Sequence, residues 1–192
     1  MEGASGGGCV APIPLGGAYA LRLFEASDVA ELHALIEANR EDLARWLPWA
    51  VGQAEHDTAG FVRGAGEQLS RNDGFQLAIV EGSRIAGAIG FPEVDWQRRT
   101  TRIGYWLDRE KQGRGTMTDA ARALVRHAFE VWDLNRVEIR AAVENRRSRA
   151  IPERLGFREE GTLRSAERVG DRYHDVVVYA MLASEWPEAA RR

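Results

Sequence analysis

The sequence predicts one α/β domain built on a single mixed, mostly antiparallel twisted sheet with helices on both faces. Segments with the two-residue period of strands alternate along the chain with segments of helical period, which is typical of this class. Two strand-like runs, 75–80 and 84–91, are joined by the short polar turn 81–83, which indicates an antiparallel hairpin. Residues 100–143 read as strand, glycine-containing loop, helix and strand, which favours a right-handed crossover between two parallel strands.

Length and composition fit one globular domain. The 192 residues are enough to bury roughly two thirds of the surface that the unfolded chain exposes. Apolar residues make up 44% and charged residues 29%, and no run of about 18 apolar residues is available for a membrane helix. We therefore expect a cytoplasmic protein without a membrane partner.

The charge and the single cysteine argue against other classes. A formal net charge of −3 disfavours broad attraction to nucleic acid, which relies on a clustered excess of Lys and Arg. Cys9 has no second thiol to pair with, so neither a disulfide framework nor a cysteine-based metal site is available. The histidines show no spacing of a zinc pair or a nucleophilic triad, and only His174 is a candidate for the border of a pocket. No metal is expected.

The two ends of the chain are expected to lie outside the domain. Residues 1–17 are rich in Gly, Ala and Pro and poor in large apolar side chains, which predicts a flexible leader. They lack the Lys or Arg followed by an apolar run that begins a secretory signal. The folded domain is expected at 18–187, with a short tail at 188–192.

The first elements are a strand and two helices. Residues 19–24 alternate as a strand does, and Ser27 then offers a hydroxyl to cap a helix that runs to about Asn39. Pro48 stops any continuous helix before a second helical pattern begins. The apolar positions of the first helix are Val29, Leu32, Leu35 and Ile36, and those of the second are Phe61, Val62, Ala65 and Leu69.

After the hairpin, the crossover occupies the middle of the chain. Residues 100–107 alternate as a strand, the helix predicted at 116–131 carries a broad apolar face, and 136–143 is again strand-like. The remaining elements are a short helix at 148–155 that ends at Gly156 and strands near 157–162 and 175–182.

The loop of this crossover is a candidate anion site. It reads Gln112-Gly113-Arg114-Gly115-Thr116 and passes directly into a helix, whose first N–H groups have no intrahelical partner and lie at the positive end of the helix dipole. The glycines let the backbone approach a ligand closely, and Arg114 can add a charge-assisted bond. Glycines between a strand and a helix also serve as plain turn residues, and the loop is neither a Walker loop nor a dinucleotide fingerprint.

Together with its neighbours, the loop resembles that of the GNAT superfamily of acetyltransferases, and within it the RimJ/RimL-like branch that acetylates protein N-termini. The family's pyrophosphate motif, Gln/Arg-x-x-Gly-x-Gly/Ala, is matched except at its last position, where Met117 replaces the small residue. This resembles the branch's variant Gln-Gly-x-Gly-x-x-Thr. The resemblance implies that the pyrophosphate of coenzyme A binds at Gln112, Gly113, Arg114, Gly115, Thr116, Met117 and Thr118.

The resemblance covers about residues 19–186 and rests on four further segments. They are Leu43 to Trp49, beside the family's acceptor site, Gly104 to Leu107, Asn145 to Phe157, similar to Asn-x-x-Ser followed by Gly-Phe, and Tyr173 to Tyr179, similar to the closing Tyr-x-Asp strand. It implies the GNAT fold, in which the central parallel pair of strands splays to admit the pantetheine arm.

The resemblance also implies roles for single residues. Backbone amides around Trp106 and Leu107 would polarise the thioester, and Asn145 would hydrogen-bond the pantetheine arm. Ser148, three residues further on, matches the residue that protonates the departing thiolate. The alternative for both Asn145 and Ser148 is helix capping.

The general base is implied at Glu167, where RimL-like members carry a glutamate that acts through water. The alternative is a surface glutamate paired with Arg164 or Arg168. Glu93 and Asp95 are second-choice bases.

Aromatic residues are the candidates for the acceptor site. Flat aromatic walls bind apolar or cationic groups without fixing one identity, which favours Trp46, Trp49 and Trp96, with core packing as the alternative. Tyr173 is a further candidate, although it could be an ordinary strand aromatic.

The resemblance therefore implies an acetyl-CoA-dependent N-acetyltransferase that acetylates a primary amine by direct attack in a ternary complex. No acyl-enzyme is expected, because Cys9 lies in the leader. A protein N-terminal α-amine is the expected acceptor. The alternatives are a small-molecule amine, such as an antibiotic, a polyamine or an amino acid derivative, and a non-catalytic acyl-CoA-binding module. A homodimer is implied by the family alone.

Overall fold

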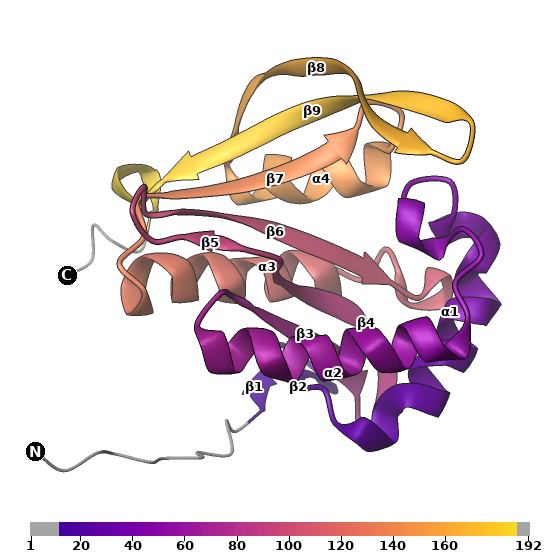
Figure 1. Cartoon of the computed structure of the whole chain (residues 1–192). Helices are drawn as coiled ribbons and strands as arrows, with labels where there is room; N and C mark the ends of the chain where they lie inside the picture. Colours follow the sequence, from indigo (N-terminus) through magenta and orange to yellow (C-terminus); the bar gives the residue numbers. More distant parts are fainter. Residues whose placement is uncertain (1–11, 188–192) are drawn as a thin grey trace, which may run out of the picture.

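A computed structural model of the chain describes residues 12–187 as one open sheet with helices on both faces (Figure 1). Within these residues the strand order is β1-β2-β3-β4-β6-β7-β9-β8, and β5 adds a short pair to β6. The β6–β7 pair is parallel, and the other pairs are antiparallel. The predicted fold class is confirmed, whereas Cys9 lies outside the described residues.

The N-terminal half of the sheet contains four strands, β1 (Ile13–Pro14), β2 (Tyr19–Leu23), β3 (Phe75–Glu81) and β4 (Arg84–Phe91). The hairpin predicted for β3 and β4 is confirmed. Strand β1 lies within the segment predicted as a leader. It pairs with β2, and the neighbouring Leu15 is buried in the core, so the ordered fold begins before residue 18.

Helix α1 (Val29–Leu43) begins directly after a 3-10 turn (Ala26–Asp28), and the predicted Ser27 cap is wrong. Asp28 is the N-cap residue of α1 but makes no side-chain bond to that helix; its carboxylate accepts the backbone N–H of Glu25 at 2.8 Å, within the 3-10 turn, and pairs with Arg22. Burial opposes its ionisation, but these bonds hold the pKa of Asp28 below its ordinary value. The helix also continues past Asn39, since no Gly or Pro follows until Pro48. Helix α2 (Glu55–Arg71) comes after that proline, as predicted.

The crossover closely follows the prediction. Strand β6 (Thr100–Leu107) leads through the glycine loop into α3 (Thr116–Arg126), which is followed directly by a π-helical segment at His127–Val131. Strand β7 (Arg136–Ala142) then pairs with β6 in parallel. No helix within the described residues is long and apolar enough to cross a membrane.

The C-terminal elements are longer than predicted. Helix α4 (Arg146–Leu155) ends at Gly156, which has φ +83°, and β8 (Arg158–Val169) pairs with β9 (Arg172–Leu182). The sequence predicts strands only near 157–162 and 175–182. Nearly all side chains of β8 are exposed and its register shifts twice, so it shows no regular apolar alternation.

Two apolar clusters flank the sheet. On β3, Ala78 and Val80 pack in the cluster that contains the inner faces of α1 and α2, whereas Leu77 and Ile79 pack in the cluster that contains those of α3 and α4. This division follows from the alternation of side chains along a strand. Figure 1 shows the two pairs of helices on opposite faces.

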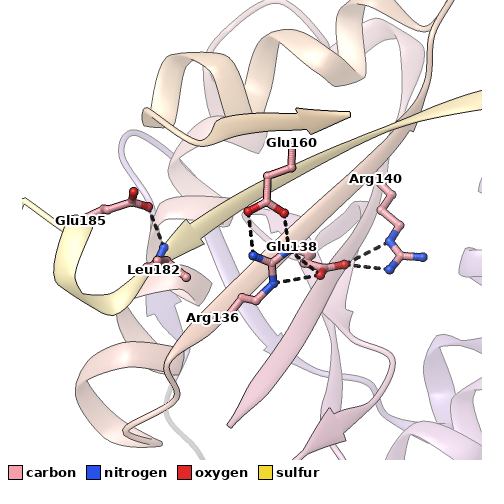
Figure 2. Close-up of polar contacts among 6 residues, drawn as sticks. All are labelled: Arg136, Glu138, Arg140, Glu160, Leu182 and Glu185. Carbon is pink, nitrogen blue, oxygen red and sulfur yellow. Dashed lines mark hydrogen bonds and ion pairs between the residues drawn. The ribbon is translucent and has the colours of Figure 1, made fainter. Parts of the chain in front are cut away.

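An ion-pair network braces the C-terminal part of the sheet (Figure 2). Arg136 on β7 donates to Glu138 on the same strand and, at 2.9 Å, to Glu160 on β8, so it spans the intervening β9. Arg140 donates to the other Glu138 oxygen at 2.8 Å. Burial opposes the ionisation of Glu138, but these hydrogen bonds hold its pKa below its ordinary value. The network therefore links β7 to β8 across the intervening strand β9.

Candidate active site

The two central strands separate halfway along their length. Strand β6 pairs with β7 only from Thr100 to Ile103, and its following residues, 104–107, pair with β4 alone. Strand β7 pairs with β9 throughout. The strands therefore diverge beyond Ile103, which leaves a gap in the middle of the sheet (Figure 1).

The register fixes which backbone groups face this gap. The Asp108 N–H donates to the Ala86 carbonyl oxygen on β4 at 2.8 Å, so in an antiparallel ladder every second residue of β6 points toward β4. Tyr105 and Leu107 consequently direct their N–H and C=O groups toward the gap, and Trp106 directs its own toward β4. The expectation for the Leu107 amide agrees with this geometry, whereas the other gap-facing amide is that of Tyr105, not Trp106.

The loop after β6 has the backbone that an anion site requires. Gly113 and Gly115 have φ of +80° and +86°, and a Cβ on either would meet no atom within 4 Å. Both glycines are exposed, while Thr116, Met117 and Thr118 are buried at the start of α3. The Met117 side chain packs in the core and so does not fill the loop.

Polar side chains tie the loop to both walls of the gap. Gln112 donates from Nε2 to the Leu107 carbonyl at 3.0 Å, and its Oε1 accepts a bond from Arg147 of α4 at 3.1 Å. Arg147 lines the cleft, whereas the predicted Arg114 does not and instead contacts the Glu110 carbonyl at 3.4 Å. Arg147 was not predicted as a site residue, because its approach to the loop depends on how α4 packs.

The start of α4 contributes Asn145 and Ser148. Asn145 is the N-cap, and its Oδ1 accepts the backbone N–H of Ser148 at 3.2 Å, so the capping alternative holds for this residue. Ser148 lies inside the first turn, not at the cap, and its Oγ is 3.2 Å from the Tyr105 hydroxyl. Both Asn145 and Ser148 line the cleft.

The other end of the cleft is lined by the β8–β9 hairpin and by the segment after α1. Glu167 and His174 are cross-strand partners there, and the His174 ring lies 5.6 Å from that of Trp46. His174 Nδ1 is 3.6 Å from a Glu144 oxygen. Among the described residues no ion pair joins Glu167 to an arginine, and Arg168 contacts Asp171 instead. The pairing alternative for Glu167 is therefore not supported.

Three of the four predicted acceptor residues do not line the cleft, and Trp46 does. Trp49 is 42% exposed and packs beside Trp106, with ring centroids 6.2 Å apart. Trp96 packs edge-on against Trp132 and donates from Nε1 to the Asn72 carbonyl at 2.8 Å. Tyr173 is 63% exposed beneath the Arg168 guanidinium. The second-choice bases Glu93 and Asp95 also lie outside the lining.

The cleft is continuous and large. Its volume is about 1430 Å³, above the range of about 300–1,000 Å³ that is common for small-molecule sites, so it has room for an extended cofactor and a second substrate. It runs from the glycine loop, past Tyr105 and Ser148, to Glu167 and His174. Within residues 12–187, no group of three or more His, Cys, Asp or Glu side chains is placed to hold a metal ion.

Comparison with known proteins identifies the family. The acetyltransferase (GNAT) domain family matches residues 19–158. YdaF of Bacillus subtilis (strain 168), provisionally named a ribosomal N-acetyltransferase, is 38% identical over 168 residues, which cover 86% of this chain and 92% of YdaF. The ribosomal-protein-serine acetyltransferase of Escherichia coli (strain K12) is 34% identical over 155 residues, which cover 80% and 87% of the two chains.

A solved structure of RimL, a ribosomal L7/L12 alpha-N-protein acetyltransferase, in complex with coenzyme A has a similar fold. Its TM-score is 0.84 at 31% identity, and the match covers 89% of this chain and 97% of that one. The split sheet, the glycine loop and these similarities agree with one another. The chain belongs to the GNAT family of acetyltransferases, enzymes that use acetyl-CoA, and its relatives place it in the RimJ/RimL-like branch.

Proposed function

We propose that this protein transfers the acetyl group of acetyl-CoA to the α-amine of a protein N-terminus. One observation carries the proposal: a single cleft connects the glycine loop, through the gap between β6 and β7, with Glu167 on the far side. Two substrates that enter from the two ends would meet where the strands separate. The acceptor class follows the ribosomal-protein names of the relatives.

The loop fits the diphosphate of coenzyme A. The positive φ angles and open surroundings of Gly113 and Gly115 allow an anion to approach the backbone N–H groups closely. Thr116, Met117 and Thr118 are buried, so they would contribute backbone amides and the dipole of α3. Gln112 adds a polar side chain, and the exposed Arg114 adds positive charge at longer range.

The gap holds the groups that acyl transfer needs. Acetyl-CoA, when bound, supplies a thioester whose C–S bond breaks as a C–N bond forms to the amine. The backbone amide of Tyr105 or that of Leu107 would donate to the carbonyl oxygen, where negative charge develops. Asn145 uses its Oδ1 as the helix cap, which leaves its NH2 group for the pantetheine arm.

Two side chains would handle the protons. Glu167 takes the proton that the amine loses, directly or through water, because its carboxylate lines the cleft and makes no ion pair within the described residues. Ser148, on the opposite side of the gap, gives a proton to the sulfur and regains one from solvent. The amine thus loses one proton and the thiolate gains one.

The acceptor end suits a polypeptide. Its rim carries exposed charged side chains, including Arg102, Arg140 and Glu144, which are 44%, 43% and 62% exposed. A site for a small molecule usually encloses most of the ligand in an apolar pocket. The first residues of a chain can instead reach into the gap while the rest leaves through a charged, hydrated rim.

Thiol release from acetyl-CoA tests the proposal. The panel contains peptides with a free N-terminal serine or alanine, the same peptides with blocked N-termini, a polyamine and amino acid amides. We expect thiol release with the free peptides and none with the blocked ones. Thiol release with the small amines alone would contradict a protein acceptor and indicate a small-molecule amine instead. No thiol release above background across the panel would contradict an enzymatic role.

Two further proposals accompany this function. A cytoplasmic location is proposed because ribosomal proteins, the substrates named for the relatives, are made there, and cell fractionation tests it. A homodimer is proposed from the family alone, and light scattering that shows a monomer at micromolar concentration would contradict it.

A further inference from the structure

Helix α4 contains a carbonyl group that its own backbone cannot satisfy in the usual way. In an α-helix the C=O of residue i accepts the N–H of residue i+4. For Ser148 that residue is Pro152, which lies buried inside the helix and has no N–H. The Ser148 carbonyl instead accepts a hydrogen bond from the Tyr105 hydroxyl at 3.0 Å. A side chain of β6 thus replaces a donor that α4 lacks.

The same hydroxyl also contacts the Ser148 side chain. Ser148 Oγ lies 3.2 Å from the Tyr105 oxygen and donates to it. A phenol has one proton, and here Tyr105 gives it to the carbonyl, so the second bond must use the proton of Ser148. Tyr105 therefore holds two atoms of one residue, and the second contact fixes the position of the Ser148 Oγ, whose O–H would rotate from Tyr105 to the sulfur when it gives up its proton.

The location of this pair gives it a consequence for the reaction. Tyr105 and Ser148 both line the cleft, on the strand and the helix that border the gap. Burial raises the pKa of Tyr105, so the phenol keeps its proton at every pH below its ordinary value of about 10. Its hydrogen bond to α4 is therefore present throughout the range in which an amine acceptor can be deprotonated.

We propose that Tyr105 is a positioning residue: its contact with Oγ fixes the Ser148 hydroxyl oxygen in the gap, while its bond to the carbonyl replaces the helical donor that Pro152 lacks. The inference rests on the proposed function, in which Ser148 returns a proton to the sulfur. Tyr105 fills the vacancy that Pro152 leaves on α4, and the same hydroxyl aligns the Ser148 Oγ through its second contact.

Tyr105→Phe removes only the hydroxyl. We expect kcat to fall about tenfold, part of the roughly 10²–10⁴-fold that a positioned acid contributes, while KM for acetyl-CoA changes less than about twofold. Adding Tyr105→Phe to Ser148→Ala should lower kcat no further, because the two residues act through one hydroxyl. A matched control is Tyr179→Phe, which removes a phenol that also binds α4, through Arg149 and Glu153, but outside the cleft. Its kcat should stay near the wild-type value.

A second variant separates positioning from simple support of the helix. Pro152→Ala restores an N–H at position 152, so it gives the Ser148 carbonyl a helical donor and offsets the melting-temperature loss caused by Tyr105→Phe. The decisive comparison is between Pro152→Ala and the double variant Tyr105→Phe/Pro152→Ala. We expect similar melting temperatures and a kcat about tenfold lower in the double variant.

Equal kcat values in these two stability-matched variants would overturn the proposal, because Tyr105 would then only support α4. A Ser148→Ala variant with wild-type kcat would also overturn it. Failure of the proposed function is distinct, since it would appear as no thiol release by the wild-type protein with any amine.

Discussion

Alanine at Gly115 would test the glycine loop, because it places an L side chain in left-handed backbone. Gly115 has φ +86° and ψ −14° and is the N-cap of α3. A Cβ there meets no heavy atom within 4 Å, so the substitution introduces no clash. The cost is that of the backbone conformation alone, about 1–2 kcal/mol.

The structure indicates that this cost will weaken ligand binding more than it lowers stability. Helix α3 cannot shift, since Thr116 to Thr118 are buried, whereas Gly113 to Gly115 are exposed and can relax. A relaxed loop must return to the strained form to present its amides to the diphosphate. At about 1.4 kcal/mol per tenfold in affinity, 1–2 kcal/mol corresponds to roughly 5- to 30-fold weaker coenzyme A binding.

Gly82→Ala is the matched control for this substitution. Gly82 also has positive φ, +60°, with open space for a Cβ, but it lies in the β3–β4 turn away from the cleft. Titration calorimetry with coenzyme A and urea unfolding should show weaker binding for Gly115→Ala, and lower stability with unchanged binding for Gly82→Ala. Equal dissociation constants for the two variants would refute the assignment of the loop.

Three other predictions concern single side chains. Glu167→Gln should lower kcat at least tenfold (order 10²–10⁴ for a general base) and leave coenzyme A affinity and stability unchanged, because the side chain is exposed; a wild-type kcat would remove it from the mechanism. Trp96→Ala should lower the free energy of unfolding, measured in urea, by about 2 kcal/mol without changing kcat or KM. A changed kcat or KM would indicate that Trp96 takes part in acceptor binding after all. Burial lowers the pKa of His127, so below about pH 6.5 the unfolded chain binds a proton that the folded one resists, and stability falls. In His127→Phe the free energy of unfolding should fall less between pH 7.5 and 5.5 than in the wild-type protein. An unchanged pH dependence would show that other groups cause the loss of stability.

The sequence was most informative where periodicity is strong. Strand β6 and helix α3 bury one face against the core, so their alternation and helical spacing predicted the crossover and the position of the glycine loop. The parallel pairing followed from the handedness of such crossovers.

Strand β8 shows why other parts were less predictable. Its side chains are mostly exposed, and backbone pairing with β9 holds it in place, so composition gave no signal for a strand through Glu167. The acceptor candidate Trp96 lies outside the cleft lining for a related reason. An aromatic residue in sequence does not reveal its partner, and here the partner is Trp132, which follows the next helix.

The positioning pair depends on contacts between distant segments. Tyr105 and Ser148 are 43 residues apart and meet only because the splayed strand and α4 border the same gap. A signal was present in Pro152, since a proline within a predicted helix leaves a carbonyl in need of another donor. Which side chain supplies the donor is decided by tertiary packing.

The central claim is that an acetyl group passes through the gap to the α-amine of a protein N-terminus. Tandem mass spectrometry of a peptide that carries both a free α-amine and a lysine, after incubation with acetyl-CoA and the protein, tests it most directly. We expect acetylation of the α-amine alone, with the yield lost in Glu167→Gln. Acetylation of the lysine side chain, or of neither amine, would contradict it.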